Sequence, residues 1–246
     1  MSIAENLAAI RDRIGAAAAR AHRRPEEINL MAVSKMHPPE RIREAYAAGQ
    51  RLFGENRIQE FGAKMPSLAE LIETEFHMIG HLQTNKSAKA AELFAAIDSI
   101  DSLKLADKLN SAARELNKTL DVLIEINVGG EAAKTGIAPE SEELESLLQS
   151  APRLEALRFR GLMTVPPFTE DPEGARPYLR KLRELRDTIA SRNLPAIGMD
   201  VLSMGMSHDF EVAIEEGSTC VRVGTAIFGE RKVREGHDFS RAAERE

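Results

Sequence analysis

Apolar and polar positions alternate along the chain in two patterns from residue 28 onward. Short apolar runs typical of strands buried on both faces are separated by longer segments with helical periodicity. The predicted strands lie near residues 28–35, 51–56, 75–81, 94–100, 120–128, 158–165, 200–205 and 219–224. The predicted helices cover residues 1–21, 39–48, 58–71, 102–116, 139–149, 174–192 and 209–216, and one link between strands is short.

Eight strands that alternate with helices predict parallel βαβ units. No glycine-rich dinucleotide-binding motif follows the first strand, so we expect a single (β/α)8 TIM-type barrel with an extra N-terminal helix. An open doubly wound sheet is the alternative. No linker divides the chain, which predicts one barrel domain over residues 1–232 and a charged C-terminal tail over 233–246.

The first predicted strand ends in a lysine, Lys35. Strand alternation places Asn29, Met31, Val33 and Lys35 on one face. If that face lines the barrel, the Lys35 ammonium lies at the mouth, where partial desolvation favours the neutral, nucleophilic amine. The alternative is a lysine that caps the strand and points into solvent.

Polar residues also occupy the ends of the second and third strands. Asn56 shares a face with Gly54, and His77 shares one with His81. Two histidines alone do not make a metal site, and no third ligand is evident, so we interpret them as hydrogen-bonded or pocket-lining residues.

The loops after strands 7 and 8 are the usual phosphate site of a barrel. Here they are rich in small and hydroxyl residues, with the sequences Leu202-Ser203-Met204-Gly205-Met206-Ser207 and Val223-Gly224-Thr225. Each sequence taken alone is typical of an ordinary turn, because glycine and serine are common in turns. Together they favour a phosphorylated ligand.

A mid-strand arginine, Arg222, needs a partner because barrel strands are buried on both faces. It either forms a structural ion pair, for which Glu125 is a candidate, or directs its charge at a ligand. For Arg160 on strand 6 we favour the structural ion pair.

Composition narrows the classes of function. With 33 basic and 39 acidic residues the net charge is −6, which argues against a nucleic-acid partner. The single cysteine, Cys220, excludes an intramolecular disulfide framework. We find no signal peptide or membrane span, so we expect a cytoplasmic protein without a membrane partner.

Several of these motifs together resemble the pyridoxal phosphate homeostasis (YggS/PROSC/PLPBP) family. The resemblance extends in order over nearly the whole chain. It is carried by the segments Ala32–Lys35, Phe53–Asn56, Phe76–Lys86, Gly161–Thr164, Leu202–Ser207 and Val221–Gly229.

The resemblance implies a barrel similar to the N-terminal domain of alanine racemase, of fold type III, that carries pyridoxal 5′-phosphate (PLP). It implies that Lys35 holds PLP as a Schiff base. The expected cofactor-contacting residues are Lys35, Asn56, His77, Ser203, Met204, Arg222, Gly224 and Thr225, with Arg222 facing the pyridine nitrogen and Ser203, Gly224 and Thr225 at the phosphate. Lys134 matches a lysine near the family's pocket, although a solvated loop lysine is an equal alternative.

We therefore expect a carrier or buffer of PLP in vitamin B6 homeostasis, without catalysis, that is monomeric and delivers PLP to PLP-dependent apoenzymes. A racemase of this fold takes a second acid from a tyrosine of another domain, whereas Tyr46 and Tyr178 lie in predicted outer helices. One alternative is a small PLP-dependent racemase or lyase. Another is a Schiff-base aldolase without cofactor.

Overall fold

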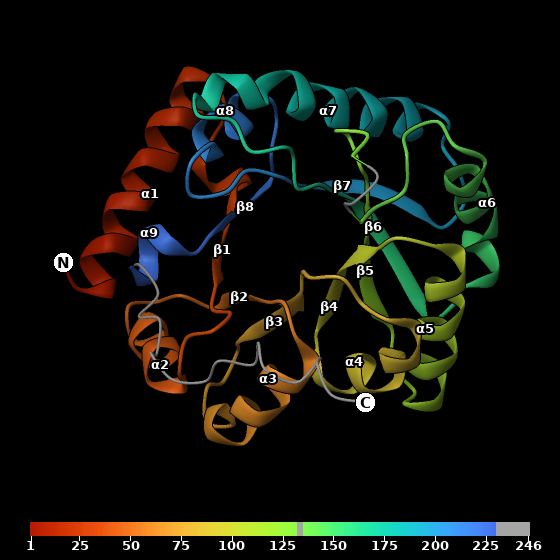
Figure 1. The fold of residues 1–246 in the computed structure, drawn as a ribbon, viewed down its shortest axis with the longest axis horizontal. Coiled ribbons are helices and arrows are strands. Elements are labelled where there is room, and N and C mark those ends of the chain that lie inside the picture. The colour runs from red at the N-terminus through yellow and green to blue at the C-terminus, as the bar shows by residue number, and fades with distance from the viewer. Residues whose placement is uncertain (132–134, 230–246) are drawn as a thin grey trace, which may run out of the picture.

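The computed structural model describes residues 1–131 and 135–229 and shows eight parallel strands closed into a barrel in the order β1 to β8. Helices surround the strands on the outside (Figure 1). The expected (β/α)8 barrel is thereby confirmed. The strands are β1 Asn29–Val33, β2 Leu52–Glu55, β3 Glu75–Met78, β4 Ala96–Ile100, β5 Leu120–Glu125, β6 Leu157–Met163, β7 Ile197–Ser203 and β8 Cys220–Val223.

The helices of the described residues follow the sequence pattern, with one addition. They are α1 Ile3–Arg20, α2 Pro39–Ala47, α3 Ile58–Lys64, α4 Ser87–Leu93, α5 Leu103–Glu115, α6 Glu142–Ser150, α7 Arg176–Ser191, α8 Phe210–Glu215 and α9 Thr225–Phe228. The sequence pattern did not predict α4, which has only seven residues and few large apolar side chains. Single 3-10 turns, such as Met65–Leu68 after α3, complete several links.

The extra N-terminal helix predicted from the sequence is α1. Ser2 and Glu5 form a capping box at its start, which satisfies backbone N–H groups that a helix end leaves unpaired. Its buried stripe includes Leu7, Ile10 and Ile14, at the three- to four-residue spacing of one helix face. The helix packs against α2, α8 and α9, beside the point where β8 meets β1.

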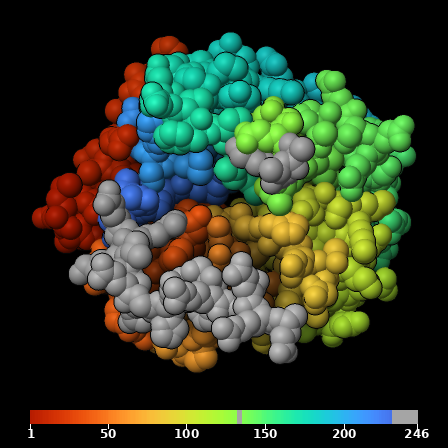
Figure 2. Space-filling model, viewed as in Figure 1, coloured from red at the N-terminus to blue at the C-terminus, as the bar shows by residue number. Residues whose placement is uncertain are grey.

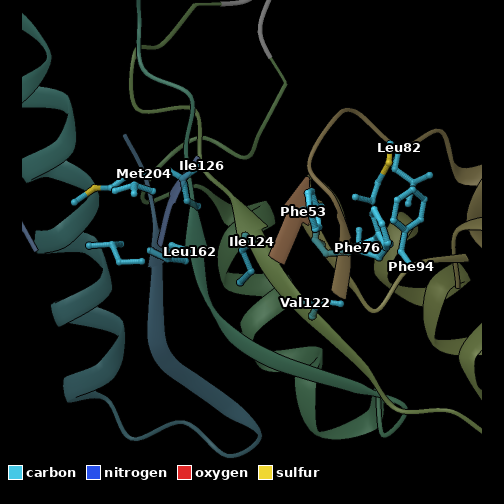
Figure 3. Close-up of a cluster of buried hydrophobic side chains, with 14 of the residues drawn as sticks. Phe53, Phe76, Leu82, Phe94, Val122, Ile124, Ile126, Leu162 and Met204 are labelled. Carbon is cyan, nitrogen blue, oxygen red and sulfur yellow. The ribbon is translucent and has the colours of Figure 1, made fainter. Parts of the chain in front are cut away.

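The main core lies between the barrel and its helices. Phe53 and Phe76 stack with ring centroids 5.3 Å apart, and Phe61 of α3 joins Phe76 at 4.7 Å. Figure 3 shows Phe53, Phe76, Phe94 and Leu82 on one side of the barrel, and Leu162 and Met204 on another. Every second side chain of each strand packs into this outer layer. The side chains between them therefore point into the barrel.

The strands end earlier than the apolar runs suggest. β1 ends at Val33 and β3 at Met78, so Lys35 and His81 lie in the loops just beyond the barrel rim. No helix among the described residues is long and apolar enough to cross a lipid bilayer.

A glycine permits the close approach of β6 to β7. Gly161 has φ +156°, the hydrogen-bond ladder between the strands changes register beside it, and a Cβ there would lie only 1.8 Å from the carbonyl oxygen of Val201.

We expect Gly161→Ala to lower the free energy of unfolding by at least about 2 kcal/mol, because the clash adds to backbone strain.

Urea unfolding measures this prediction, with Gly15→Ala in α1 as its control. Gly15 has open space around its Cβ position, so this change should stabilise the protein by about 0.5 to 1 kcal/mol. Equal effects of the two substitutions would contradict the proposed close approach at Gly161.

Candidate functional site

A cavity of about 600 Å³ opens at the carboxyl ends of the strands. Figure 2 shows the molecule hollowed near its centre, between the blue segment of β8 and α9 and the orange segments of the first strands. The residues that line it lie at or just beyond strand ends. They include Val33, Lys35, His37, Asn56, Gly80, His81, Glu125, Thr135, Met206, Ser207, His208, Arg222, Gly224 and Thr225.

Lys35 lies two residues beyond β1, half-buried, and lines the cavity beside Val33. The alternation of β1 therefore predicted its orientation correctly, and the alternative of a lysine pointing into bulk solvent is wrong. The surrounding structure fixes the short segment from Ser34 to Met36 that carries this side chain.

A group of charges lies behind this segment, with Lys64 and Glu55 buried and Glu60 half-buried, and we call these three residues the Lys64 cluster. The Nζ of Lys64, on α3, is 3.0 Å from Oε1 of Glu55 and 2.6 Å from Oε1 of Glu60. Lys64 is 8% exposed and Glu55 is fully buried. An ion pair at this depth is weakly screened by solvent and by salt.

The Lys64 cluster holds the backbone on both sides of Lys35. The Ser34 hydroxyl donates to Glu55 Oε1 at 2.8 Å, and Lys64 Nζ donates to the Ser34 carbonyl at 3.2 Å. On the other side, the backbone N–H of Met36 donates to Glu60. Met36 has φ +63°, a conformation that a non-glycine residue keeps only when its surroundings impose it.

The two carboxylates of the cluster respond differently to their surroundings. Burial raises the pKa of Glu55, in spite of the attraction of Lys64, and its Oε2 has no hydrogen-bond partner. Burial acts in the same direction on Glu60, but hydrogen bonds from Lys64 and from the Met36 backbone outweigh it and lower the pKa of Glu60. Glu60 is thus the anionic partner of Lys64.

Arg222 projects from β8 into the base of the cavity and is 4% exposed. Its Nη1 donates to Ser203 Oγ at 2.8 Å and its Nη2 donates to the carbonyl of Thr164 at 2.7 Å. Within the described residues it forms no ion pair, so the structural pair with Glu125 that the sequence left open is not made. Arg222 and Glu125 instead line the same cavity.

The loops after β7 and β8 meet at the cavity, as predicted, but through different residues on the β7 side. Gly224 and Thr225 line the cavity, and the Gly224 N–H donates to Ser207 Oγ at 3.3 Å. Ser203 and Met204 do not reach it.

Their position on β7 explains the difference. Ser203 is the last residue of the strand and is fully buried beneath Arg222, and Met204 packs outward into the core. Gly205, with φ +93°, turns the chain so that Met206, Ser207 and His208 reach the cavity. Ser207 lies in the motif quoted from the sequence, but alternation could not identify it because the strand has already ended.

Asn56, just beyond β2, lines the cavity as predicted and lies tightly against the loop after β3. A Cβ on Gly80 would lie 2.6 Å from the carbonyl oxygen of Asn56. His81 of the same loop also lines the cavity, and its Nδ1 is 3.0 Å from Oδ2 of Asp101.

His77 does not join the other candidate residues. It lines a second cavity of about 340 Å³ at the amino end of the barrel, with its Nδ1 3.1 Å from Asp98 Oδ1. Alternation predicted the face of β3 correctly, but it does not distinguish the two ends of the barrel. Arg160 lines the same second cavity and pairs with Asp121 at 3.1 Å, as the structural interpretation predicted.

Lys134 and the tail 233–246 lie outside the described residues. Across residues 1–131 and 135–229, no group of three or more His, Cys, Asp or Glu side chains is arranged to hold a metal ion.

Comparisons with known proteins identify the family to which this chain belongs. Residues 6–232 match the family described as alanine racemase, N-terminal domain. The chain is 47% identical over 232 residues to a pyridoxal phosphate homeostasis protein of Aquifex aeolicus, covering 94% of this chain and 100% of that one. It is 46% identical to a protein of the same name from Escherichia coli K12, covering 93% and 97%.

Solved structures agree with the sequence comparison. PipY of Synechococcus elongatus, in a structure with PLP bound, is 37% identical with a TM-score of 0.80, covering 93% of this chain and 100% of that one. Alanine racemase of Streptomyces coelicolor has a TM-score of 0.67 at 22% identity, covering 90% of this chain and 58% of that one, and so shares the fold. The resemblance drawn from the motifs is confirmed.

The Lys64 cluster gives a stability prediction. Lys64→Met should lower the free energy of unfolding by about 3 to 5 kcal/mol, because it leaves buried carboxylates without their cation. Lys89→Met, which removes an exposed pair with Glu92, should cost less than about 1 kcal/mol. The triple change Lys64→Met, Glu55→Gln and Glu60→Gln should recover much of the loss, and chemical denaturation of the four proteins tests the set.

His77 gives a pH prediction. Burial opposes its charge, but the Asp98 carboxylate and then Glu75 outweigh burial and raise the pKa of His77 to about 10 from 6.5. Its ion pair therefore stabilises the fold fully below about pH 6.5, and this contribution disappears as the pH rises through about 10. The difference in unfolding free energy between wild type and His77→Gln should shrink over that range. A constant difference would show that His77 is neutral in the folded protein.

Proposed function

The chain belongs to the alanine racemase N-terminal domain family and, within it, to the pyridoxal phosphate homeostasis proteins, and on that basis we propose that it binds pyridoxal 5′-phosphate through Lys35. The observation that carries the proposal is a lysine held by its flanking backbone in a cavity that is also lined by hydroxyls and glycine backbone from the loops after β7 and β8. PLP supplies an aldehyde that condenses with a primary amine and a phosphate that suits such donors.

The residues of the cavity fit this cofactor. Lys35 binds the aldehyde, and Ser207, Gly224 and Thr225 hold the phosphate, whereas Ser203 accepts a hydrogen bond from Arg222 beneath the cavity. Asn56 contacts the ring. His77 and Met204 are left out of the proposed site because neither lines this cavity.

Arg222 is proposed to face the ring nitrogen, and this supports binding without catalysis. A guanidinium has donors only and cannot accept a proton, so it stabilises an unprotonated ring nitrogen. A carboxylate at that position would keep the nitrogen protonated and make the ring a stronger electron sink. Tyr46 on α2 and Tyr178 on α7 lie outside the barrel and supply no acid to the cavity.

We therefore propose a carrier or buffer that holds PLP reversibly in vitamin B6 homeostasis and releases it to PLP-dependent apoenzymes. A cytoplasmic location and a monomeric state stay predictions of the sequence.

The decisive measurement is absorbance of the purified protein mixed with PLP, followed by borohydride reduction and peptide mapping. We expect a visible band whose reduction fixes the cofactor on the peptide that contains Lys35. Lys35→Ala should lose the band, whereas Lys104→Ala, at an exposed lysine of α5, should keep it. A band that persists in Lys35→Ala would refute the assignment, and amino-acid turnover that disappears in Lys35→Ala would favour the enzyme.

The phosphate loops allow a separate test. The double change Ser207→Ala and Thr225→Val should weaken PLP binding by about tenfold, because two hydrogen bonds to a charged group are lost. Binding of pyridoxal, which has no phosphate, should change by less than about twofold. Equal losses for the two ligands would place the phosphate elsewhere.

A further inference from the structure

Glu125 is a buried carboxyl group in the cavity with one oxygen unused. It is the last residue of β5, which lies across the eight-stranded barrel from β1, and it is 6% exposed. Its Oε1 accepts a hydrogen bond from Thr135 Oγ1 at 2.8 Å, whereas its Oε2 has no partner among residues 1–131 and 135–229. Such a group costs about 1 to 3 kcal/mol when nothing satisfies it.

Backbone hydrogen bonds fix the main chain at Glu125. The Glu125 carbonyl accepts from Ile137 N–H at 2.8 Å, and the next amide, of Ile126, donates to the Met163 carbonyl at 2.8 Å. On the neighbouring strand β6 the register partner is Met163, which cannot titrate. The unused oxygen belongs to a rigid part of the barrel rim.

The charges around Glu125 come from three other segments. Asp101 after β4 disfavours its ionisation, and Arg222 on β8 and His81 after β3 favour it. Burial is the largest influence and, with Asp101, raises the pKa of Glu125 despite the Thr135 hydrogen bond, Arg222 and His81. The neutral form of Glu125 therefore persists to higher pH than in an exposed glutamate, and in that form Oε2 can carry a proton.

Resting on the proposed function, we propose that Glu125 is a ligand-binding residue whose protonated Oε2 donates a hydrogen bond to the pyridoxal ring, on the side of the cavity opposite Lys35. The acceptor is an oxygen or nitrogen substituent of the ring. Ionisation of Glu125 removes this donor and places a negative charge beside an anionic ligand. The residue thus makes retention of the cofactor sensitive to pH.

The direction of the effect follows from the proton balance. The donor is present below the pKa of Glu125 in the folded protein and is lost as the pH rises through it. PLP affinity of the wild type should therefore fall with rising pH more steeply than that of Glu125→Gln, whose amide donates at every pH. Titration of Lys35 and of the ligand itself affects both proteins equally and cancels in the comparison.

The experiment is equilibrium titration with PLP, followed by absorbance, of the full chain from pH 4.5, the ordinary pKa of a glutamate, to pH 9. We expect the wild type to lose about tenfold more affinity over this range than Glu125→Gln, and Glu125→Ala to bind weakly throughout. Glu115→Gln, at an exposed position of α5, is the matched control and should follow the wild type. Melting temperatures of the ligand-free proteins establish that each variant is folded.

Thr135→Val gives an independent test that leaves Glu125 in place. Its hydroxyl lowers the pKa of Glu125, so its removal should shift the wild-type binding curve to higher pH. This test decides the question if Glu125→Gln does not fold.

The outcomes separate the inference from the function on which it rests. Parallel pH profiles for wild type and Glu125→Gln, or an unshifted curve for Thr135→Val, overturn the role of Glu125 and leave PLP binding intact. Failure of the wild type to take up PLP at any pH overturns both. A steeper wild-type profile supports the inference.

Discussion

The position of Lys35 depends on the buried Lys64 cluster. Removing an ammonium and two carboxylates from water costs several kcal/mol per ion, and an apolar group of the same volume would suit a core better. The charges instead fix how these elements are oriented. Lys64 Nζ contacts Glu55 of β2, Glu60 of α3 and the Ser34 carbonyl beside β1. Three elements are thereby fixed around one nitrogen, and the segment that carries Lys35 has little freedom to move.

The two ends of the barrel use similar residues for different purposes. At the amino end, His77 pairs with Asp98 and Arg160 pairs with Asp121, so each charge is compensated within the protein. At the carboxyl end, the described residues give Arg222 only neutral hydrogen-bond partners and leave one oxygen of Glu125 without a partner. Buried polar groups are normally satisfied. The incomplete pairing at the carboxyl end therefore indicates where a ligand completes the structure, and the complete pairing at the amino end indicates stabilisation of the fold.

Sequence patterns could predict the barrel and the orientation of Lys35, because alternation along β1 decides which face a side chain occupies. They could not predict whether a residue lies near the amino or the carboxyl end of its strand. His77 was therefore expected with the residues at the carboxyl ends, whereas it lines the cavity at the amino ends. They also could not predict where β7 ends, so Ser203 and Met204 were expected where Ser207 and His208 lie. The Lys64 cluster could not be predicted from the sequence for another reason. Glu60 and Lys64 look like an ordinary exposed helix pair at spacing i, i+4, and only long-range packing against β1 and β2 buries Lys64 and leaves Glu60 half-buried.

The charges that line the cavity agree with the proposal that this barrel binds a reactive aldehyde without catalysing further chemistry. Carbanion chemistry is favoured by a protonated ring nitrogen and by acids or bases on both faces of a substrate. Arg222 can only donate, and it is already oriented by Ser203 and Thr164. Burial raises the pKa of Glu125, so its neutral form, which can donate a hydrogen bond, persists to higher pH than in an exposed glutamate. In the proposed function both groups act as donors that stabilise the bound ligand, and the reversible bond of Lys35 determines whether the ligand stays.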